Sequence, residues 1–239
     1  MAMALDHHQA HHMNEALTRV LYTRVLRPGD TALDVGANRG DHTAEMARIV
    51  GQTGLVHAVE PNRHHLPKLV SLGPNVITWP FAAGETLKIA KLYIPAHDDG
   101  WASLDDRRPS MPGATFSVQS VVEVPLDDIE EIAGSPISFI KIDVEEHEIN
   151  ALRGMRGLIA SRQPVIVFEN ATNEIATLLS DLHYDLLDLC GRPYQPGVLP
   201  FANCLARRST ASSEIVEMTT IPQMVFDAEF ADMRRTFNR

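Results

Sequence analysis

The chain has 239 residues, of which 44% are hydrophobic and 22% are charged, and this composition is ordinary for a globular protein. The length fits one α/β domain, or one such domain with modest additions. The formal charge of -10 argues against a nucleic-acid phosphate track or a polybasic membrane patch as the main partner surface. Cys190 and Cys204 form neither a metal-binding spacing nor a disulfide framework. With no signal peptide and no apolar run of membrane-spanning length, a cytoplasmic protein is expected.

Apolar periodicity along the chain predicts alternating helices and strands. After an expected tail at residues 1–13, the predicted helices are residues 14–26, 44–50, 63–72, 126–132, 147–160 and 174–182. The predicted strands follow residues 31–35, 55–59, 75–82, 87–95, 117–125, 137–144, 164–168, 184–189 and 203–206. A loop at 96–115 separates two alternating strands, and residues 215–239 carry apolar residues at helical spacing. Strands that alternate with helices indicate an α/β fold with a doubly wound, mainly parallel sheet.

The stretch T-A-L-D-V-G-A-N-R-G-D-H-T at residues 31–43 combines a buried strand, a glycine-rich turn and a helix start. Its G-x-x-x-G spacing differs from the G-x-G-x-x-G that holds a dinucleotide pyrophosphate. Asp34 lies near the carboxyl end of the strand, where open α/β sheets bind ligands. An acidic residue there suits a cationic ligand, and S-adenosylmethionine fits that description. The alternative is a tight turn that binds nothing.

A second acidic residue, Glu60, ends the next predicted strand, 20 residues after Gly40. An acidic side chain at this offset is placed to bond the two hydroxyls of a ribose. A solvated glutamate at a strand end is the alternative.

Three segments together resemble one family. L-D-V-G-A-N-R-G, F-I-K-I-D-V-E-E-H-E and P-V-I-V-F-E-N resemble, in this order, motifs of the FkbM-type methyltransferases, and the resemblance covers residues 28–206. It implies an S-adenosylmethionine-dependent O-methyltransferase with a Rossmann-like, seven-stranded class I sheet, helices on both faces and an extra β-hairpin after the third strand. The family pattern resembles K-I-D-V-E-G-x-E, and here Glu146 replaces the glycine. The expected organisation is a tail and helix at 1–27, the methyltransferase domain at 28–208 and a C-terminal helix at 209–239.

The matching positions imply a cofactor site. The glycine loop is expected to hold the methionine part, Glu60 to bond the ribose, and the end of the third strand to lie beside the adenine. Trp101 is either a wall of this site or an ordinary packing residue. The expected cofactor-binding residues are Asp34, Gly36, Asn38, Gly40, Glu60, Asn62, Phe81, Ala82, Ser103 and Asp143.

Catalysis requires a group that takes the proton of an acceptor hydroxyl. His147, four residues past the strand-end Asp143, is the first choice for this base, because an imidazole accepts protons near neutral pH. Glu146 is the second choice, on condition that burial weakens its acidity. Asp143, Glu169 and Asn170 end neighbouring strands and offer the oxygen ligands of a Mg²⁺ site, similar to that of catechol-type O-methyltransferases. Alternatively, these carboxylates act without a metal.

The expected acceptor is a small molecule or glycan with a free hydroxyl, on a saccharide or a secondary metabolite. Nucleic acid is not expected as a partner, and a homodimer is expected through the N-terminal helix or the C-terminal segment. Two other interpretations stay open at this point. One is a methyltransferase-like binding or scaffold subunit without activity, and the other is an NAD(P)-dependent oxidoreductase on a similar sheet.

Overall fold

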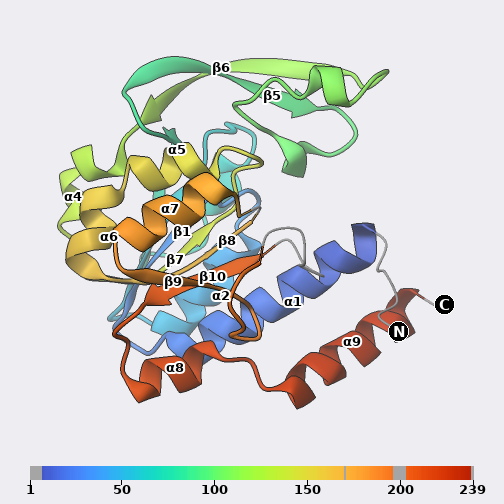
Figure 1. Ribbon diagram of the computed structural model, residues 1–239. Coiled ribbons are helices and arrows are strands. Elements are labelled where there is room, and N and C mark those ends of the chain that lie inside the picture. The colour runs from blue at the N-terminus through green and yellow to red at the C-terminus, as the bar shows by residue number, and fades with distance from the viewer. Residues whose placement is uncertain (1–6, 170, 196–202, 238–239) are drawn as a thin grey trace. The chain divides into compact units, whose positions relative to one another are not determined.

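The computed structural model describes residues 7–169, 171–195 and 203–237 (Figure 1). The chain divides into two compact units. One is Leu26–Pro164, and the other combines Met1–Val25 with Val165–Arg239. The expected domain boundaries at residues 27 and 208 stay a prediction.

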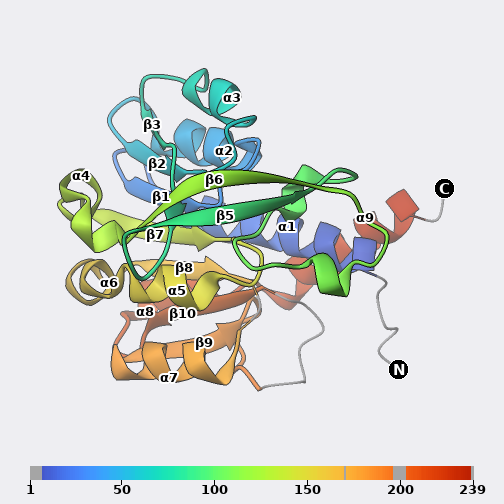
Figure 2. The ribbon, with the colours of Figure 1, turned by 90° about the horizontal axis from the view of Figure 1, so that it is seen from above.

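The unit Leu26–Pro164 is built on four parallel strands. They lie side by side in the order β3-β2-β1-β7 (Figure 2). Their bounds are β1 (Thr31–Val35), β2 (Leu55–Val59), β3 (Val76–Trp79) and β7 (Ile137–Ile142). All five residues of β1 are buried, which explains why its sequence is a nearly continuous apolar run. Parallel pairing places the carboxyl ends of β1, β2 and β7 at one edge, where Asp34 pairs with Ala58 and Lys141.

Helices connect these strands. Their bounds are α2 (Asp41–Val50), α3 (Leu66–Val70), α4 (Glu130–Ala133), α5 (Glu148–Arg153) and α6 (Arg156–Arg162). The helix predicted at 147–160 is two helices that meet at Gly154, and α3 is shorter than the predicted 63–72. The acidic helix predicted at 126–132 is the 3-10 turn η3 (Leu126–Asp128) followed by α4.

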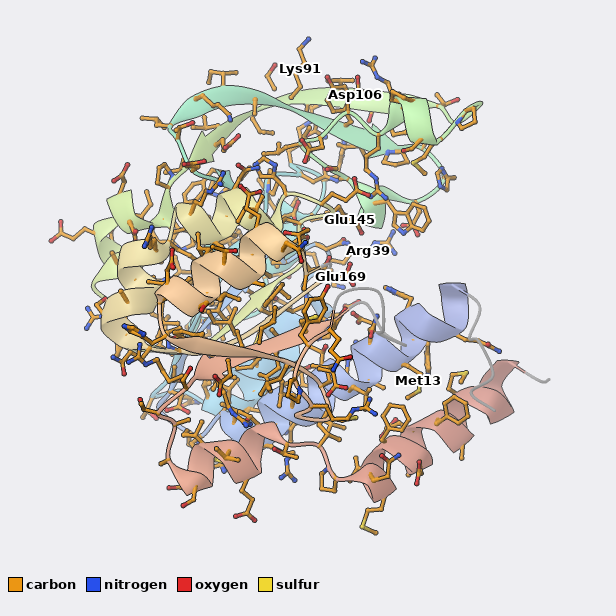
Figure 3. The ribbon with its side chains drawn as sticks, in the orientation of Figure 1. Met13, Arg39, Lys91, Asp106, Glu145 and Glu169 are labelled. Carbon is orange, nitrogen blue, oxygen red and sulfur yellow. The ribbon has the colours of Figure 1, made fainter. Side chains whose placement is uncertain are left out.

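The predicted β-hairpin is present in the same unit and forms a separate small sheet. Its strands are β4 (Ala82–Ala83), β5 (Lys88–Pro95) and β6 (Phe116–Val124), in the order β4-β6-β5. Alternate residues turn inward, and Leu92, Ile94 and Val121 form its core with Ala82. The connecting loop contains the 3-10 turns η1 (Asp99–Trp101) and η2 (Arg108–Ser110). Lys91 and Asp106 lie on the outer side of the hairpin, away from Glu145 (Figure 3).

The second unit contains three strands of its own, β8 (Val165–Phe168), β10 (Cys204–Arg208) and β9 (Tyr184–Asp188), and β10 is antiparallel to both neighbours. Its helices are α1 (His7–Val25), α7 (Asn173–Asp181), α8 (Ser213–Thr219) and α9 (Gln223–Phe237). α1 begins at His7, so part of the expected tail is helical. α9 packs along α1 (Figure 1), and each helix contributes a fully buried methionine, Met13 and Met233.

The seven strands predicted for the main sheet are therefore present, four in one unit and three in the other. Strands and helices alternate along both, which confirms the α/β class. Among the helices of the described residues, none has the length and hydropathy needed to cross a lipid bilayer.

Candidate functional site

The turn after β1 is shaped by Gly36. Its φ of 79° is a left-handed conformation that side chains disfavour. An added Cβ would also overlap the carbonyl oxygen of Asp143, because the segment after β7 crosses this turn closely. The backbone N–H of Asp143 donates to the carbonyl of Val35 at 2.9 Å. Gly36 therefore allows the ends of β1 and β7 to meet at the site.

Asp34 lies fully buried beneath this turn. Its Oδ2 accepts a 2.6 Å hydrogen bond from the Thr43 hydroxyl, whereas its Oδ1 has no hydrogen-bond partner. The ammonium group of Lys141, also buried, lies 3.8 Å from Asp34 Oδ1 and 3.2 Å from Asp143 Oδ2. This cation offsets part of the negative charge of the buried Asp34 and the partly exposed Asp143.

Glu60 joins the two loops that follow β1 and β2. Its Oε2 accepts from the backbone N–H of Asn38 and its Oε1 from that of Asn62, each at 2.7 Å. Burial raises the pKa of Glu60 to about 7, although the two backbone N–H groups act in the opposite direction. Each oxygen keeps a further lone pair. The carboxylate is thus fixed in place and can accept hydrogen bonds from a ligand.

These loops border a pocket that is open to solvent. Six predicted site residues line it: Gly36, Asn38, Glu60, Ala82, Asp143 and His147. The hairpin supplies an apolar wall through Leu92, Ala102 and Leu104. The pocket is therefore polar at the strand ends and apolar at the hairpin.

Other predicted cofactor residues lie close to the pocket without lining it. Asn62 is fully buried, and its Oδ1 accepts from His64 N and Gln119 Nε2. The ring of Phe81 packs against Trp79, with 5.8 Å between centroids. Gly40 has a φ of 81° and precedes α2. The hydroxyl of Ser103 donates to the carbonyl of Glu145 at 2.6 Å, which ties the hairpin loop to the segment after β7.

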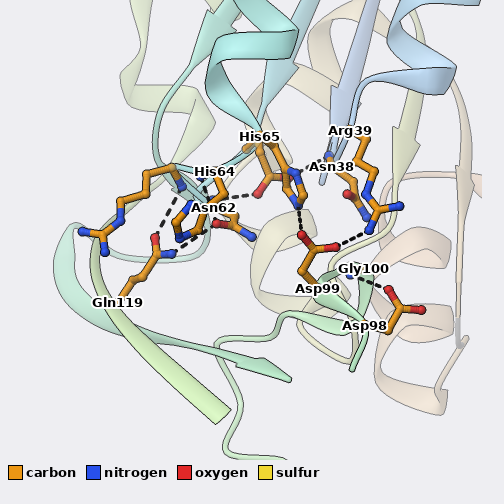
Figure 4. A network of polar contacts seen from close by, with 11 residues as sticks. Asn38, Arg39, Asn62, His64, His65, Asp98, Asp99, Gly100 and Gln119 are labelled. Atoms are coloured by element: carbon orange, nitrogen blue, oxygen red, sulfur yellow. Dashed lines mark hydrogen bonds and ion pairs between the residues drawn. The ribbon is translucent and has the colours of Figure 1, made fainter. Parts of the chain in front are cut away.

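A polar network that the sequence does not predict closes one side of the pocket (Figure 4). Asp99, in the hairpin loop, pairs with Arg39 of the glycine loop at 2.5 Å and lies 3.6 Å from His65 Nε2. Asp98 caps the same turn by accepting from the backbone N–H of Gly100 at 3.0 Å. Asp99, Gly100 and His65 all line the pocket. The acidic pair Asp98-Asp99 in a long loop is the sequence signal for this wall, and nothing local marks His65.

The segment after β7 carries two consecutive glutamates in left-handed conformations, Glu145 with φ 55° and Glu146 with φ 78°. Burial, together with the nearby charge of Asp143, raises the pKa of Glu145 to about 7, and Arg107 counteracts this through a 2.6 Å bond. Glu146 stands where the family pattern has glycine, and its φ shows why glycine suits the position. Its side chain is 58% exposed, so the burial required for its role as a base is not present.

His147 immediately precedes α5 and is buried. Its Nδ1 lies 3.3 Å from Asp105 Oδ2 and 3.2 Å from the Asn150 amide nitrogen. Its Nε2 lies 3.6 Å from Glu123 Oε1. Carboxylates from the hairpin and its loop therefore face both ring nitrogens of the predicted base, and neither Glu123 nor Asp105 is among the site residues predicted from the sequence.

The predicted Mg²⁺ ligands belong to different parts of the chain. Asp143 follows β7, whereas Glu169 directly follows β8 in the other unit. Asn170 lies outside the described residues. The metal site therefore stays a prediction.

Comparison with known proteins gives one family match. The sequence model of the Methyltransferase FkbM domain matches residues 34–190. No curated protein matches the sequence.

Several solved structures align with the chain at low sequence identity. Methyltransferase FkbM from Methylobacillus flagellatus KT aligns with a TM-score of 0.50 and 20% identity, over 79% of this chain and 47% of that one. The present chain thus spans about half the length of that protein. A precorrin-6y C5,15-methyltransferase from Geobacter metallireducens GS-15 aligns at 0.45 and 14%, over 82% and 88%. An S-adenosylmethionine-dependent O-methyltransferase from Thermotoga maritima aligns at 0.45 and 14%, over 83% and 66%.

Proposed function

The chain belongs to the FkbM family of S-adenosylmethionine-dependent methyltransferases, and from that premise we propose that it transfers a methyl group to a hydroxyl of a saccharide or secondary-metabolite acceptor. The observation that carries this proposal is the buried Glu60 carboxylate, which two backbone N–H groups hold at the edge of the pocket.

The residues of the pocket fit S-adenosylmethionine. Glu60 offers lone pairs to a ribose diol, and the apolar wall from the hairpin suits an adenine ring. The buried oxygens Asp34 Oδ1 and Asn38 Oδ1 have no hydrogen-bond partner. Asn38 lines the pocket, and its Oδ1 suits the ammonium group of the methionine part, because a buried acceptor without a donor is costly. Asp34 Oδ1, 3.8 Å from Lys141 Nζ, adds negative charge beneath the turn. The acidic side of the pocket also favours a ligand that carries positive charge.

S-adenosylmethionine, when bound, supplies an electrophilic methyl group. The task of the protein is then to align the acceptor oxygen and to remove its proton. His147 lines the pocket and is our first choice for this base, ahead of Glu146, whose carboxylate is mostly in solvent. Asp143 lines the same pocket and helps to hold the cofactor.

We include Mg²⁺ in the proposal as an aid that would stabilise negative charge on the acceptor oxygen. Asp143, Glu169 and Asn170 would hold it, since two carboxylates and an amide oxygen are the hard donors that this ion prefers. If EDTA does not change the rate of methyl transfer, Mg²⁺ has no role in the reaction.

A saccharide is the preferred acceptor because aromatic and polar side chains lie together beside the pocket. Trp101 makes an edge contact with His97, with centroids 6.0 Å apart, and Arg107 lies 5.8 Å from its ring centroid. Half-buried aromatic rings of this kind stack on the apolar face of a sugar, and Asp98 and Arg107 offer hydrogen bonds to its hydroxyls.

A cytoplasmic location is part of the proposal, because two cysteines without a disulfide framework suit a reducing compartment. A homodimer remains part of the proposal, and sedimentation at several protein concentrations tests it.

Methyl transfer is tested with labelled S-adenosylmethionine and a panel of methyl hexopyranosides, catechol and a small aliphatic alcohol. The proposal predicts label in the glycosides, and label confined to catechol would overturn the saccharide assignment. Binding of S-adenosylhomocysteine without turnover of any acceptor would favour a binding or scaffold subunit. Binding of NAD(P) in its place would favour the oxidoreductase.

A further inference from the structure

We propose that Glu123 is a positioning residue, which holds the Nε2–H of His147 and so leaves Nδ1 as the nitrogen that takes the acceptor proton. The inference rests on the proposed function, and it adds a residue of the hairpin to the site.

The side chains of Glu123 and His147 face each other in the interior of the protein. Glu123 Oε1 lies 3.6 Å from His147 Nε2. Both atoms are buried, and neither has a hydrogen-bond partner. Unpaired donors and acceptors of this kind are costly to bury. We expect this contact to shorten to a hydrogen bond when the acceptor binds.

The position of Glu123 is fixed from two sides. Its neighbour across the hairpin, Lys88, places its ammonium 3.1 Å from Oε2, which leaves Oε1 for the histidine. Gly84 supplies the space, because an added Cβ there would overlap the Glu123 carboxylate. With only 1% of its side chain exposed, Glu123 has no other described polar group within reach of Oε1. A carboxylate held in this way fixes the tautomer and the ring orientation of a histidine.

The opposite ring nitrogen is the one that an incoming oxygen can reach. Asp105 Oδ2 already lies 3.3 Å from Nδ1, and it belongs to a loop side chain that is 54% exposed. In the proposal the acceptor oxygen reaches Nδ1, because this nitrogen faces the partly exposed side chain of Asp105, whereas Nε2 faces the buried carboxylate of Glu123. When Nε2 carries the hydrogen, the lone pair of Nδ1 accepts from the Asn150 amide nitrogen at 3.2 Å, and the acceptor hydroxyl takes the place of that donor when it binds.

The proton transfer needs no group other than the acceptor hydroxyl, the imidazole of His147 and the methyl donor. The O–H bond of the acceptor breaks, and its proton forms an N–H bond at Nδ1. The oxygen keeps the electron pair that forms its new bond to the methyl carbon. The resulting imidazolium has one N–H toward Asp105 and one toward Glu123, so its charge is stabilised on both sides.

A purely structural role is the rival explanation, because the same contact also links the hairpin to the start of α5. The chain offers a matched control for that role. Glu85, which precedes β5, pairs with Arg153 of α5 at 3.3 Å, and both side chains are well exposed. Glu85→Gln removes a hairpin-to-α5 link without touching the pocket.

The first arm of the test reads the tautomer directly, by ¹⁵N NMR of histidine-labelled protein with S-adenosylhomocysteine added. His147 is assigned by the signal that His147→Gln removes. Wild-type protein, Glu123→Gln and Glu85→Gln are expected to show the Nε2–H tautomer, since a glutamine oxygen still accepts from Nε2. Glu123→Ala is expected to show a mixture of tautomers. Retention of the Nε2–H form in Glu123→Ala would overturn the inference.

The second arm measures turnover with the methyl hexopyranoside panel. Glu123→Ala should lower kcat roughly tenfold to a hundredfold with an unchanged KM for S-adenosylmethionine, and Glu123→Gln should restore part of the loss. A fall no larger than that of Glu85→Gln would show that the contact is only structural and would overturn the inference. If wild-type protein methylates none of the glycosides, the saccharide acceptor is refuted separately. The tautomer arm then decides on Glu123 alone.

Discussion

Replacing Glu60 by glutamine should change how the stability of the protein depends on pH. Burial raises the pKa of Glu60 from 4.5 to about 7, so the folded protein binds this proton more tightly than the unfolded chain does. The resulting stabilisation is fully present below pH 4.5 and is lost as the pH rises through 7. The gap between the two pKa values corresponds to about 3 kcal/mol. Wild-type protein therefore loses about this much stability between pH 5 and pH 9 through Glu60, and Glu60→Gln does not.

Urea unfolding of both proteins across this pH range measures the effect. Glu145 and Glu148, whose pKa values burial also raises to about 7, are common to both proteins, so their contributions cancel in the difference. Glu85→Gln, at an exposed carboxyl outside the pocket, controls for the exchange of a glutamate for a glutamine as such. A difference between wild type and Glu60→Gln that stays constant from pH 5 to pH 9 would refute the argument that the buried site holds Glu60 uncharged.

Three further predictions concern the backbone and charges of the site. Gly36→Ala should lower the free energy of unfolding by more than about 3 kcal/mol, because it combines a left-handed φ with overlap on Asp143; a variant with the wild-type urea midpoint would contradict this. Glu146→Gly should raise it by about 0.5–1 kcal/mol by relieving a φ of 78°. Glu146→Ala keeps the strain, and an equal gain there would argue against this cause. Lys141→Met leaves the fully buried Asp34 without its cation, so thermal unfolding should show a loss of about 3–5 kcal/mol; wild-type stability would show that the ion pair contributes little.

Those parts of the site that are formed by residues close together in the sequence could be predicted from the sequence. The strand, turn and helix around Gly36 follow from an apolar run, two glycines and a helix start within thirteen residues. Glu60 follows from its position at the end of the next strand, because parallel strands bring their carboxyl ends together. The hairpin follows from alternation of apolar and polar residues.

The contacts between distant segments could not be predicted in this way. Asp99 meets Arg39 across 60 residues, and periodicity fixes the face of an element but not its partner. The sequence indicates Glu123 only weakly. It is a charged residue at a position of β6 where the alternation of apolar and polar residues predicts a buried side chain, as at Val121. A charged residue at an inward-facing position indicates that it has a buried partner, but the sequence does not show which residue that is. His147 is that partner only because the hairpin folds back toward the start of α5.

Isothermal titration with S-adenosylhomocysteine tests the central claim most directly. Wild-type protein is expected to bind with micromolar affinity. Glu60→Gln, shown to be folded by its unfolding curve at the same pH, should bind roughly tenfold more weakly, because an NH₂ group that cannot accept a hydrogen bond from the ligand replaces one acceptor oxygen. Equal affinity of the two proteins would remove Glu60 from the site. No binding to wild-type protein at any ligand concentration or pH tested would contradict the assignment of this pocket to the cofactor.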